Sequence, residues 1–170
     1  RIEDEGRINL EKLTKFHSLE GGESFCLSDT RIRVIRNVHP PIKDSFALRF
    51  EWGKLSVVLS GDTAYMPEMI DFADHADLLI HEVMLSEGID LIMSRLGHED
   101  HKLKKHLLQS HTLAEKAGLI AQCAKVKCLA LNHFVPDGFP EFNDDDWLQA
   151  VRKHWTGKVI LGKDGIRIPL

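Results

Sequence analysis

Three polar residues each follow directly on a run of apolar or β-branched residues: His39, Asp62 and His133. A neutral imidazole is the commonest metal ligand in proteins, and a carboxylate can bridge two cations. Each residue alone has an ordinary explanation, since a turn aspartate accepts backbone N–H groups and a lone histidine usually lies at the surface. Three such residues at three expected strand ends nevertheless predict one shared metal site, and the ligand types suit zinc.

Strands must deliver these side chains to one place, and the hydrophobic pattern supplies them. We expect strands at residues 31–38, 45–52, 55–60, 77–81 and 127–132. The first alternates polar and apolar residues, which is typical of a half-buried strand. The second and third are joined by Gly53-Lys54 and predict a hairpin. The last two are short apolar runs, as in buried parallel strands.

Helices are expected between and after these strands, at residues 67–73, 112–124 and 143–154. Ser110 or Thr112 would cap the second helix, and Asn143 with the acids that follow it would open the third. Residues 84–109 show no clean period and predict a partly helical excursion, and residues 159–161 and 166–168 predict a terminal hairpin. The order predicts an α/β fold, a mixed β-sheet with flanking helices, as a single domain over residues 1–170.

The composition of the chain disfavours several classes of partner and of site. The net charge is -4, so no basic field favours nucleic acid as a partner. No apolar run reaches the roughly 18 residues that cross a bilayer, so we expect no membrane partner. Three cysteines, Cys26, Cys123 and Cys128, without a Cys-x-x-Cys pair, predict neither a disulfide framework nor a cysteine-rich zinc site. The compartment is left unknown, with a cytoplasmic one favoured, and a homo-oligomer is left open.

Five ordered segments resemble one family, the metallo-β-lactamase superfamily, and in particular its arylsulfatase-like and tRNA 3′-end-processing branches. The segments are Val38-His39 with Phe46–Phe50, Leu59–Thr63, Ala76–Glu82, Ser110–Gly118 and Val126–Pro136. The resemblance covers most of the chain from about Ile32 onward. It implies an αββα sandwich, of which this chain would be the C-terminal part, and a centre with two zinc ions, with manganese as an alternative metal.

The same resemblance implies a role for each site residue. His39 matches a ligand of one metal, Asp62 the bridging carboxylate, and His133 a ligand of the second metal. His111 matches a histidine proposed to help protonate the leaving group, and Glu82 matches its orienting carboxylate. A histidine held by a carboxylate has a fixed tautomer and a raised basicity. The alternative for His111 is a residue that merely enters a helix.

The chain departs from the family in one motif. The superfamily carries a His-x-His-x-Asp-His motif upstream, and residues 1–30 do not contain it. The nearest imitation, Gly97–His101, has the wrong spacing and follows Gly-Asp-Thr, so we interpret it as part of a solvated, charged excursion. Each metal would then have about two protein ligands where catalytic zinc usually has three. We therefore expect this chain alone to bind metal weakly and to be inactive. We expect a preceding segment to complete the site and to cover the second sheet face, with another chain as the alternative cover for that face.

Two functions follow. The first is a metal-dependent hydrolase of a small-molecule ester, of phospho-, sulfo- or lactone type. tRNA processing is less favoured, because that branch often carries a long insert where residues 50–61 are short. The second is a non-catalytic half-domain that acts as a binding or dimerisation module. A metal-free serine hydrolase using Ser60 or Ser110 is disfavoured, since the chain lacks a Gly-x-Ser-x-Gly elbow.

Overall fold

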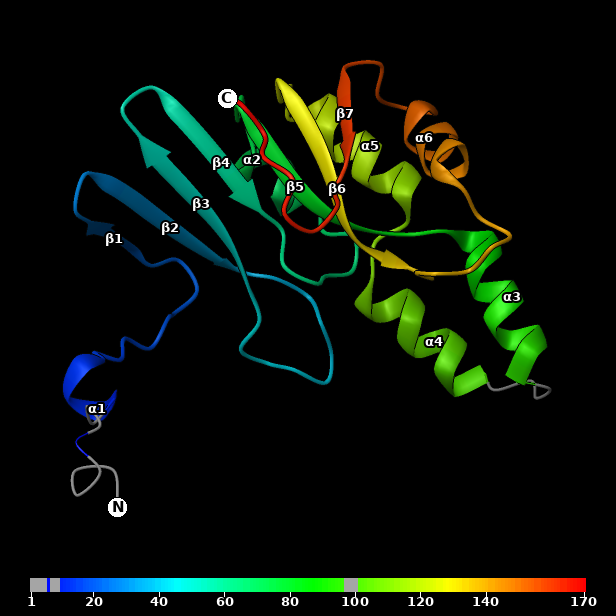
Figure 1. The fold of residues 1–170 in the computed structure, drawn as a ribbon, viewed down its shortest axis with the longest axis horizontal. Helices are drawn as coiled ribbons and strands as arrows, with labels where there is room; N and C mark the ends of the chain where they lie inside the picture. The colour runs from blue at the N-terminus through cyan, green and yellow to red at the C-terminus, as the bar shows by residue number, and fades with distance from the viewer. Residues whose placement is uncertain (1–5, 7–9, 97–100) are drawn as a thin grey trace.

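A seven-stranded mixed sheet organises the protein, with its strands arranged in chain order (Figure 1). The computed structural model describes residue 6 and residues 10–96 and 101–170. Strands β1 to β4 pair antiparallel, and β4 to β7 pair parallel. The strands are β1 (Ser24–Leu27), β2 (Thr30–Arg36), β3 (Phe46–Trp52), β4 (Leu55–Leu59), β5 (Leu78–Met84), β6 (Cys128–Val135) and β7 (Lys158–Leu161).

Helices cover one face of this sheet and form the main core with it. The helices are α1 (Leu10–Leu13), α2 (Glu68–Phe72), α3 (Ser86–Leu96), α4 (His101–Ser110), α5 (Ala114–Cys123) and α6 (Asp144–Arg152). Met69 of α2, Ile120 of α5 and Val151 of α6 are fully buried in the same cluster as Val58 and Leu129 of the sheet. Helices α3 and α4 extend from the end of the sheet in Figure 1. In the described part of the chain, no helix is both long enough and apolar enough to span a bilayer.

The opposite sheet face is less well covered. The C-terminal segment crosses it in Figure 1, and Ile168 packs against a small cluster of Leu78, Cys128 and Ala130. Phe50 remains only partly buried on this face. Apolar side chains that are partly open to water can be buried further against another layer. This face therefore suits packing against a second sheet, as in a β-sandwich.

The expected mixed sheet with flanking helices is confirmed, and so are its five expected strands, three expected helices and the helical excursion. Asn143 caps α6 with a full capping box, as predicted. Two predictions are wrong. Residues 166–168 form no strand, because β7 pairs parallel with β6 instead of folding into a hairpin. Neither Ser110 nor Thr112 caps α5, whose N-cap is Leu113, without a side-chain hydrogen bond.

Candidate metal-binding site

Five predicted site residues come from five separate segments and converge at one end of the sheet. His39 follows β2, Asp62 follows β4, Glu82 lies in β5, His111 follows α4, and His133 lies in β6. The imidazole ring of His111 is 5.3 Å from that of His39 and 5.5 Å from that of His133, between centroids. Glu82 contacts His111, and Asp62 contacts His133. The structure thus brings all five residues into one cluster.

His39 is held in a single tautomer by the end of α4. Its Nδ1 lies 3.0 Å from the backbone carbonyl oxygen of Ser110, and a carbonyl only accepts. Nδ1 therefore carries the proton and donates it, which leaves the lone pair on Nε2. A backbone carbonyl that fixes the tautomer in this way is the usual partner of a metal-binding histidine. In the neutral ring, Nε2 is thus the atom of His39 that could bind a metal.

Asp62 and His133 face one another across the site. Asp62 Oδ2 lies 3.4 Å from His133 Nε2, and both side chains are close to half exposed. Two ligand atoms bonded to the same tetrahedral zinc are separated by about 3.4 Å, given metal–ligand distances near 2.1 Å. This pair therefore has the chemistry and the spacing of two ligands of one metal ion.

A β-bulge presents His133 to the site. Asn132 pairs with Glu82 and Phe134 pairs with Val83, so His133 is the extra residue between them. Its φ of 45° lies in the left-handed region, which is uncommon for a residue with a side chain. The sequence places His133 at a strand end, but the strand resumes after it to Val135. The bulge therefore re-aims this side chain in the middle of a strand.

Glu82 and His111 form a buried hydrogen-bonded pair. Its Oε1 lies 3.2 Å from His111 Nδ1 and also accepts the backbone N–H of Thr63 at 2.8 Å. Glu82 is fully buried and His111 is only 10% exposed. Burial raises the pKa of Glu82, and the hydrogen bond to Glu82 raises the pKa of His111. The hydrogen bond from Nδ1 to Glu82 thus stabilises the protonated form of His111.

The cluster supplies only part of a complete ligand set. Among residues 10–96 and 101–170, no three His, Cys, Asp or Glu side chains come close enough together to hold one metal ion. His98 of the Gly97–His101 segment lies outside the described residues. A metal here would accordingly draw about two ligands from the described residues. The histidine nitrogen and aspartate oxygen donors are of the types that bind zinc.

Buried polar residues behind the cluster were missed by the sequence reasoning. Asn37, Thr63 and Thr112 are almost fully buried and hydrogen bond to the segments that carry the site residues. Thr63 was visible as the third residue of Gly-Asp-Thr. The other two carry no local signal, because their partners are distant in sequence.

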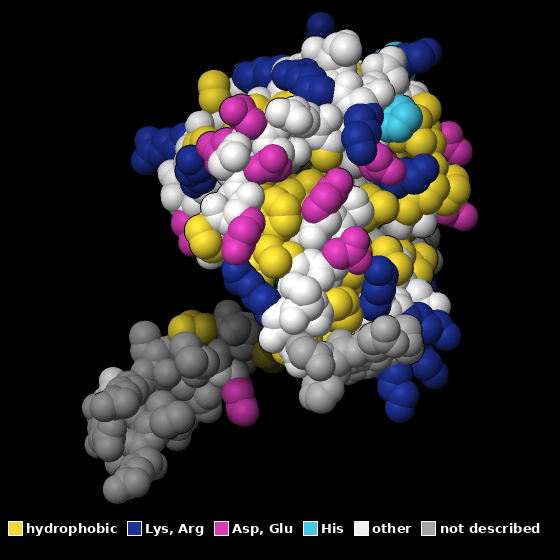
Figure 2. Space-filling view, turned by 90° about the vertical axis from the view of Figure 1, so that its right-hand side faces the viewer, with side chains coloured by type: hydrophobic (Ala, Val, Ile, Leu, Met, Phe, Trp, Pro, Cys, Tyr) yellow, Lys and Arg dark blue, Asp and Glu magenta, His cyan; other side chains and the backbone are white. Residues whose placement is uncertain are grey.

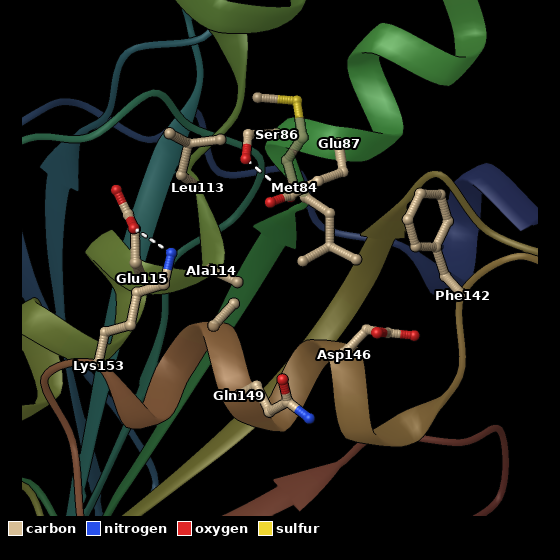
Figure 3. Close-up of a pocket in the computed structure, with 12 residues that line it drawn as sticks. Met84, Ser86, Glu87, Leu113, Ala114, Glu115, Phe142, Asp146, Gln149 and Lys153 are labelled. Carbon is tan, nitrogen blue, oxygen red and sulfur yellow. Dashed lines mark hydrogen bonds and ion pairs between the residues drawn. The ribbon is translucent and has the colours of Figure 1, made fainter.

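A separate cavity of about 200 Å³ lies between β5, α5 and α6 (Figure 3). Its charged groups are paired, since Lys153 Nζ lies 3.0 Å from Glu115 Oε2 and Ser86 donates to Glu87. None of the five cluster residues lines it. The face in Figure 2 mixes acidic, basic and apolar side chains. We therefore place the candidate site at the histidine cluster and not in this cavity.

Comparison with known proteins identifies the family. The family described as "Anti-Pycsar protein Apyc1" matches residues 1–127. The chain belongs to this family. The part that matches the Apyc1 family contains His39, Asp62, Glu82 and His111, whereas His133 follows it.

This Apyc1-family chain is also similar to several individual proteins. A ribonuclease Z of Mycobacterium tuberculosis (strain H37Rv) is 26% identical over 152 residues, which are 89% of this chain and 53% of that protein. The metallo-β-lactamase fold protein YhfI of Bacillus subtilis matches with a TM-score of 0.68 and 24% identity, over 92% of this chain and 58% of YhfI. The short form of human tRNase Z matches with a TM-score of 0.53 and 21% identity, over 86% of this chain and 45% of that protein.

These matches confirm the resemblance to the metallo-β-lactamase superfamily, including its tRNA-processing-like branch, and they show the fold of the Apyc1-family chain. The chain spans little more than half the length of the M. tuberculosis relative and of YhfI. The activity and the partners of the whole protein are therefore matters for proposal.

Proposed function

We propose that the protein is a metal-dependent hydrolase of esters, with phosphodiesters as the first class to test. The observation that carries the proposal is the meeting of two pairs in one cluster: Asp62 with His133, which could bind metal, and Glu82 with His111, which could carry a proton. Curated relatives named ribonuclease Z support a phosphodiester over a sulfate ester or a lactone. The similarity to YhfI supports the metallo-β-lactamase fold on which this proposal relies.

Zinc is the proposed metal, with manganese as the alternative. His39, Asp62 and His133 would together supply about two ligands to each of two such ions, and we propose that the remaining ligands come from protein outside the described residues. When bound, a pair of such ions would activate water and polarise the scissile bond. The nitrogen and oxygen donors suit zinc better than they suit calcium or magnesium, which prefer oxygen alone.

The chain's own residues would handle the leaving group. Glu82 accepts from His111 Nδ1 and fixes the ring, so that the second ring nitrogen can donate a proton to the departing oxygen. The raised pKa of His111 keeps that proton available near neutral pH. Burial of Glu82 shields this contact from water, which strengthens it.

The test measures zinc binding and hydrolysis together. Bis(p-nitrophenyl) phosphate, p-nitrophenyl sulfate and a simple lactone would be offered, with zinc, with manganese and after chelation, to a protein in which the remaining metal ligands are present. We expect chelator-sensitive cleavage of the phosphodiester, and its loss in Asp62→Asn, with Asp71→Asn on α2 as the matched control. Cleavage that survives complete metal removal would refute the proposal.

One observation favours a second function. The partly open apolar face, with Phe50 on it, would suit a binding or dimerisation module. A protein that binds no metal, cleaves no ester and forms a stable dimer would support that function in place of the hydrolase.

A further inference from the structure

Two of the proposed metal ligands are not brought together by the sheet itself. His39 follows β2 and Asp62 follows β4, and β3 lies between these strands. Neighbouring strands are about 4.8 Å apart, so β2 and β4 are about 10 Å apart. Sheet pairing alone would thus hold the two ligands too far apart to share a site. Interactions outside the strand pairing must therefore hold the segment after β2 close to the segment after β4.

Three hydrogen bonds do this. The Asn37 side-chain amide donates to the Ser60 carbonyl at 2.7 Å. The Val38 backbone N–H donates to the Thr63 hydroxyl at 3.1 Å, and the Ala64 N–H donates to the Val38 carbonyl at 2.7 Å. We call these three bonds the loop clamp. They flank both ligands, because His39 directly follows Val38 and Asp62 lies between Ser60 and Thr63.

The clamp passes close over the start of β3. A Cβ on Gly61 would lie 2.8 Å from the Phe46 carbonyl oxygen and 2.9 Å from the Asn37 side-chain nitrogen. Phe46 is the first residue of β3. Residue 61 therefore crosses the intervening strand at a distance that only glycine permits, which is how the two outer segments meet.

Thr63 also joins the clamp to the proton-transfer pair. Its N–H donates to Glu82, and its carbonyl accepts from the Thr112 hydroxyl at 2.6 Å, one residue after His111. Thr63 is fully buried, so these bonds do not compete with water. A single residue thus contacts the segments that carry four of the five cluster residues.

We infer that Asn37 and Thr63 are positioning residues, whose side chains set the separation of His39 and Asp62 for metal binding. The inference rests on the proposed function, since it takes His39 and Asp62 as metal ligands. Neither side chain needs to touch metal or substrate. Residues that hold metal ligands in this way typically change metal affinity by 10- to 100-fold when they are replaced.

The test compares Thr63→Val with Thr63→Ser. Valine keeps the shape and removes the hydroxyl, whereas serine keeps the hydroxyl. We expect zinc affinity, followed by titration of the histidine ring signals in NMR, to fall about 10- to 100-fold in Thr63→Val and to stay near wild type in Thr63→Ser. Equal zinc affinity in all three proteins, or an equal loss in both variants, would overturn the inference.

A second measurement, the hydrogen exchange of one backbone amide, does not depend on zinc. The Ala64 amide belongs to the clamp through the backbone and not through the Thr63 side chain. We expect its hydrogen exchange to quicken about tenfold in Thr63→Val only, with the Val58 amide in β4 unchanged. A wild-type protein that binds no zinc would refute the proposed function, and Ala64 exchange would then decide the clamp alone. Should Thr63→Val fail to fold, Asn37→Asp, which lacks the donor, takes its place under the same criteria.

Discussion

Gly61 and Gly53 form a natural pair for measuring the close approach at the candidate site. Both have φ of +59°, so alanine at either position meets the same backbone penalty. They differ in their surroundings. No atom lies within 4 Å of a Cβ on Gly53, in the β3–β4 turn, whereas a Cβ on Gly61 would lie 2.8 Å from the Phe46 carbonyl oxygen. The difference between the two variants isolates the crowding.

The expected magnitudes follow from these two terms. A left-handed backbone costs a residue with a Cβ about 1–2 kcal/mol, and the smaller entropy of the unfolded chain returns up to about 1 kcal/mol. Gly53→Ala should therefore lower the free energy of unfolding by about 1 kcal/mol. Overpacking adds about 1–3 kcal/mol, so Gly61→Ala should lower it by about 2–4 kcal/mol.

Urea unfolding followed by far-ultraviolet circular dichroism would measure both values, provided that the slope with denaturant is unchanged. Equal losses in Gly61→Ala and Gly53→Ala would refute the reasoning, because they would show that residue 61 has room for a side chain. A larger loss of stability in Gly61→Ala should be accompanied by a change in metal binding. The displaced loop should weaken zinc binding, which Gly53→Ala should leave unchanged.

Three further predictions concern the site and the core beside it. Burial lowers the pKa of His81 to about 4, so the unfolded state binds a proton at a higher pH than the folded state does. The free energy of unfolding should therefore fall by up to about 3 kcal/mol as the pH drops from 6.5 to 4. In urea unfolding, His81→Leu should lack this part of the pH dependence. Glu82→Gln should reduce kcat/KM for bis(p-nitrophenyl) phosphate by about 10²- to 10⁴-fold with zinc content unchanged; loss of zinc instead would assign Glu82 to the metal. His133→Gly should be about 1 kcal/mol more stable than His133→Ala, because φ there is 45°, and equal urea midpoints would argue against strain at the bulge.

Much of the fold was predictable because its signals are local. The alternation before His39 and the apolar runs before Asp62 and His133 each predict a strand from a few neighbouring residues. The same signals predicted that these residues lie at one edge of the sheet, whereas the approach of His39 to Asp62 depends on the loop clamp, which they did not predict. Glu82 and His111 came from family resemblance, and the structure places them in hydrogen-bond contact.

The features that were missed depend on distant partners. Asn37 binds a carbonyl 23 positions away, and nothing near it in the sequence indicates this. The bulge at His133 arises from its pairing with β5 and not from its own neighbours. Residues 163–165 carry a strong turn signal that predicted a hairpin, but β6 offered residues 158–161 a parallel edge instead.

The agreement between strand order and chain order bears on how the protein folds. No strand has to insert between two earlier ones, so the sheet can grow from one edge to the other. The β3–β4 hairpin turns through Gly53 and Lys54 alone and can close in microseconds, whereas β5 and β6 must wait for their helical crossovers. His133 is on β6, so the cluster becomes complete only at a late step. Metal added during refolding would therefore report on the last stages of assembly and could not direct the first.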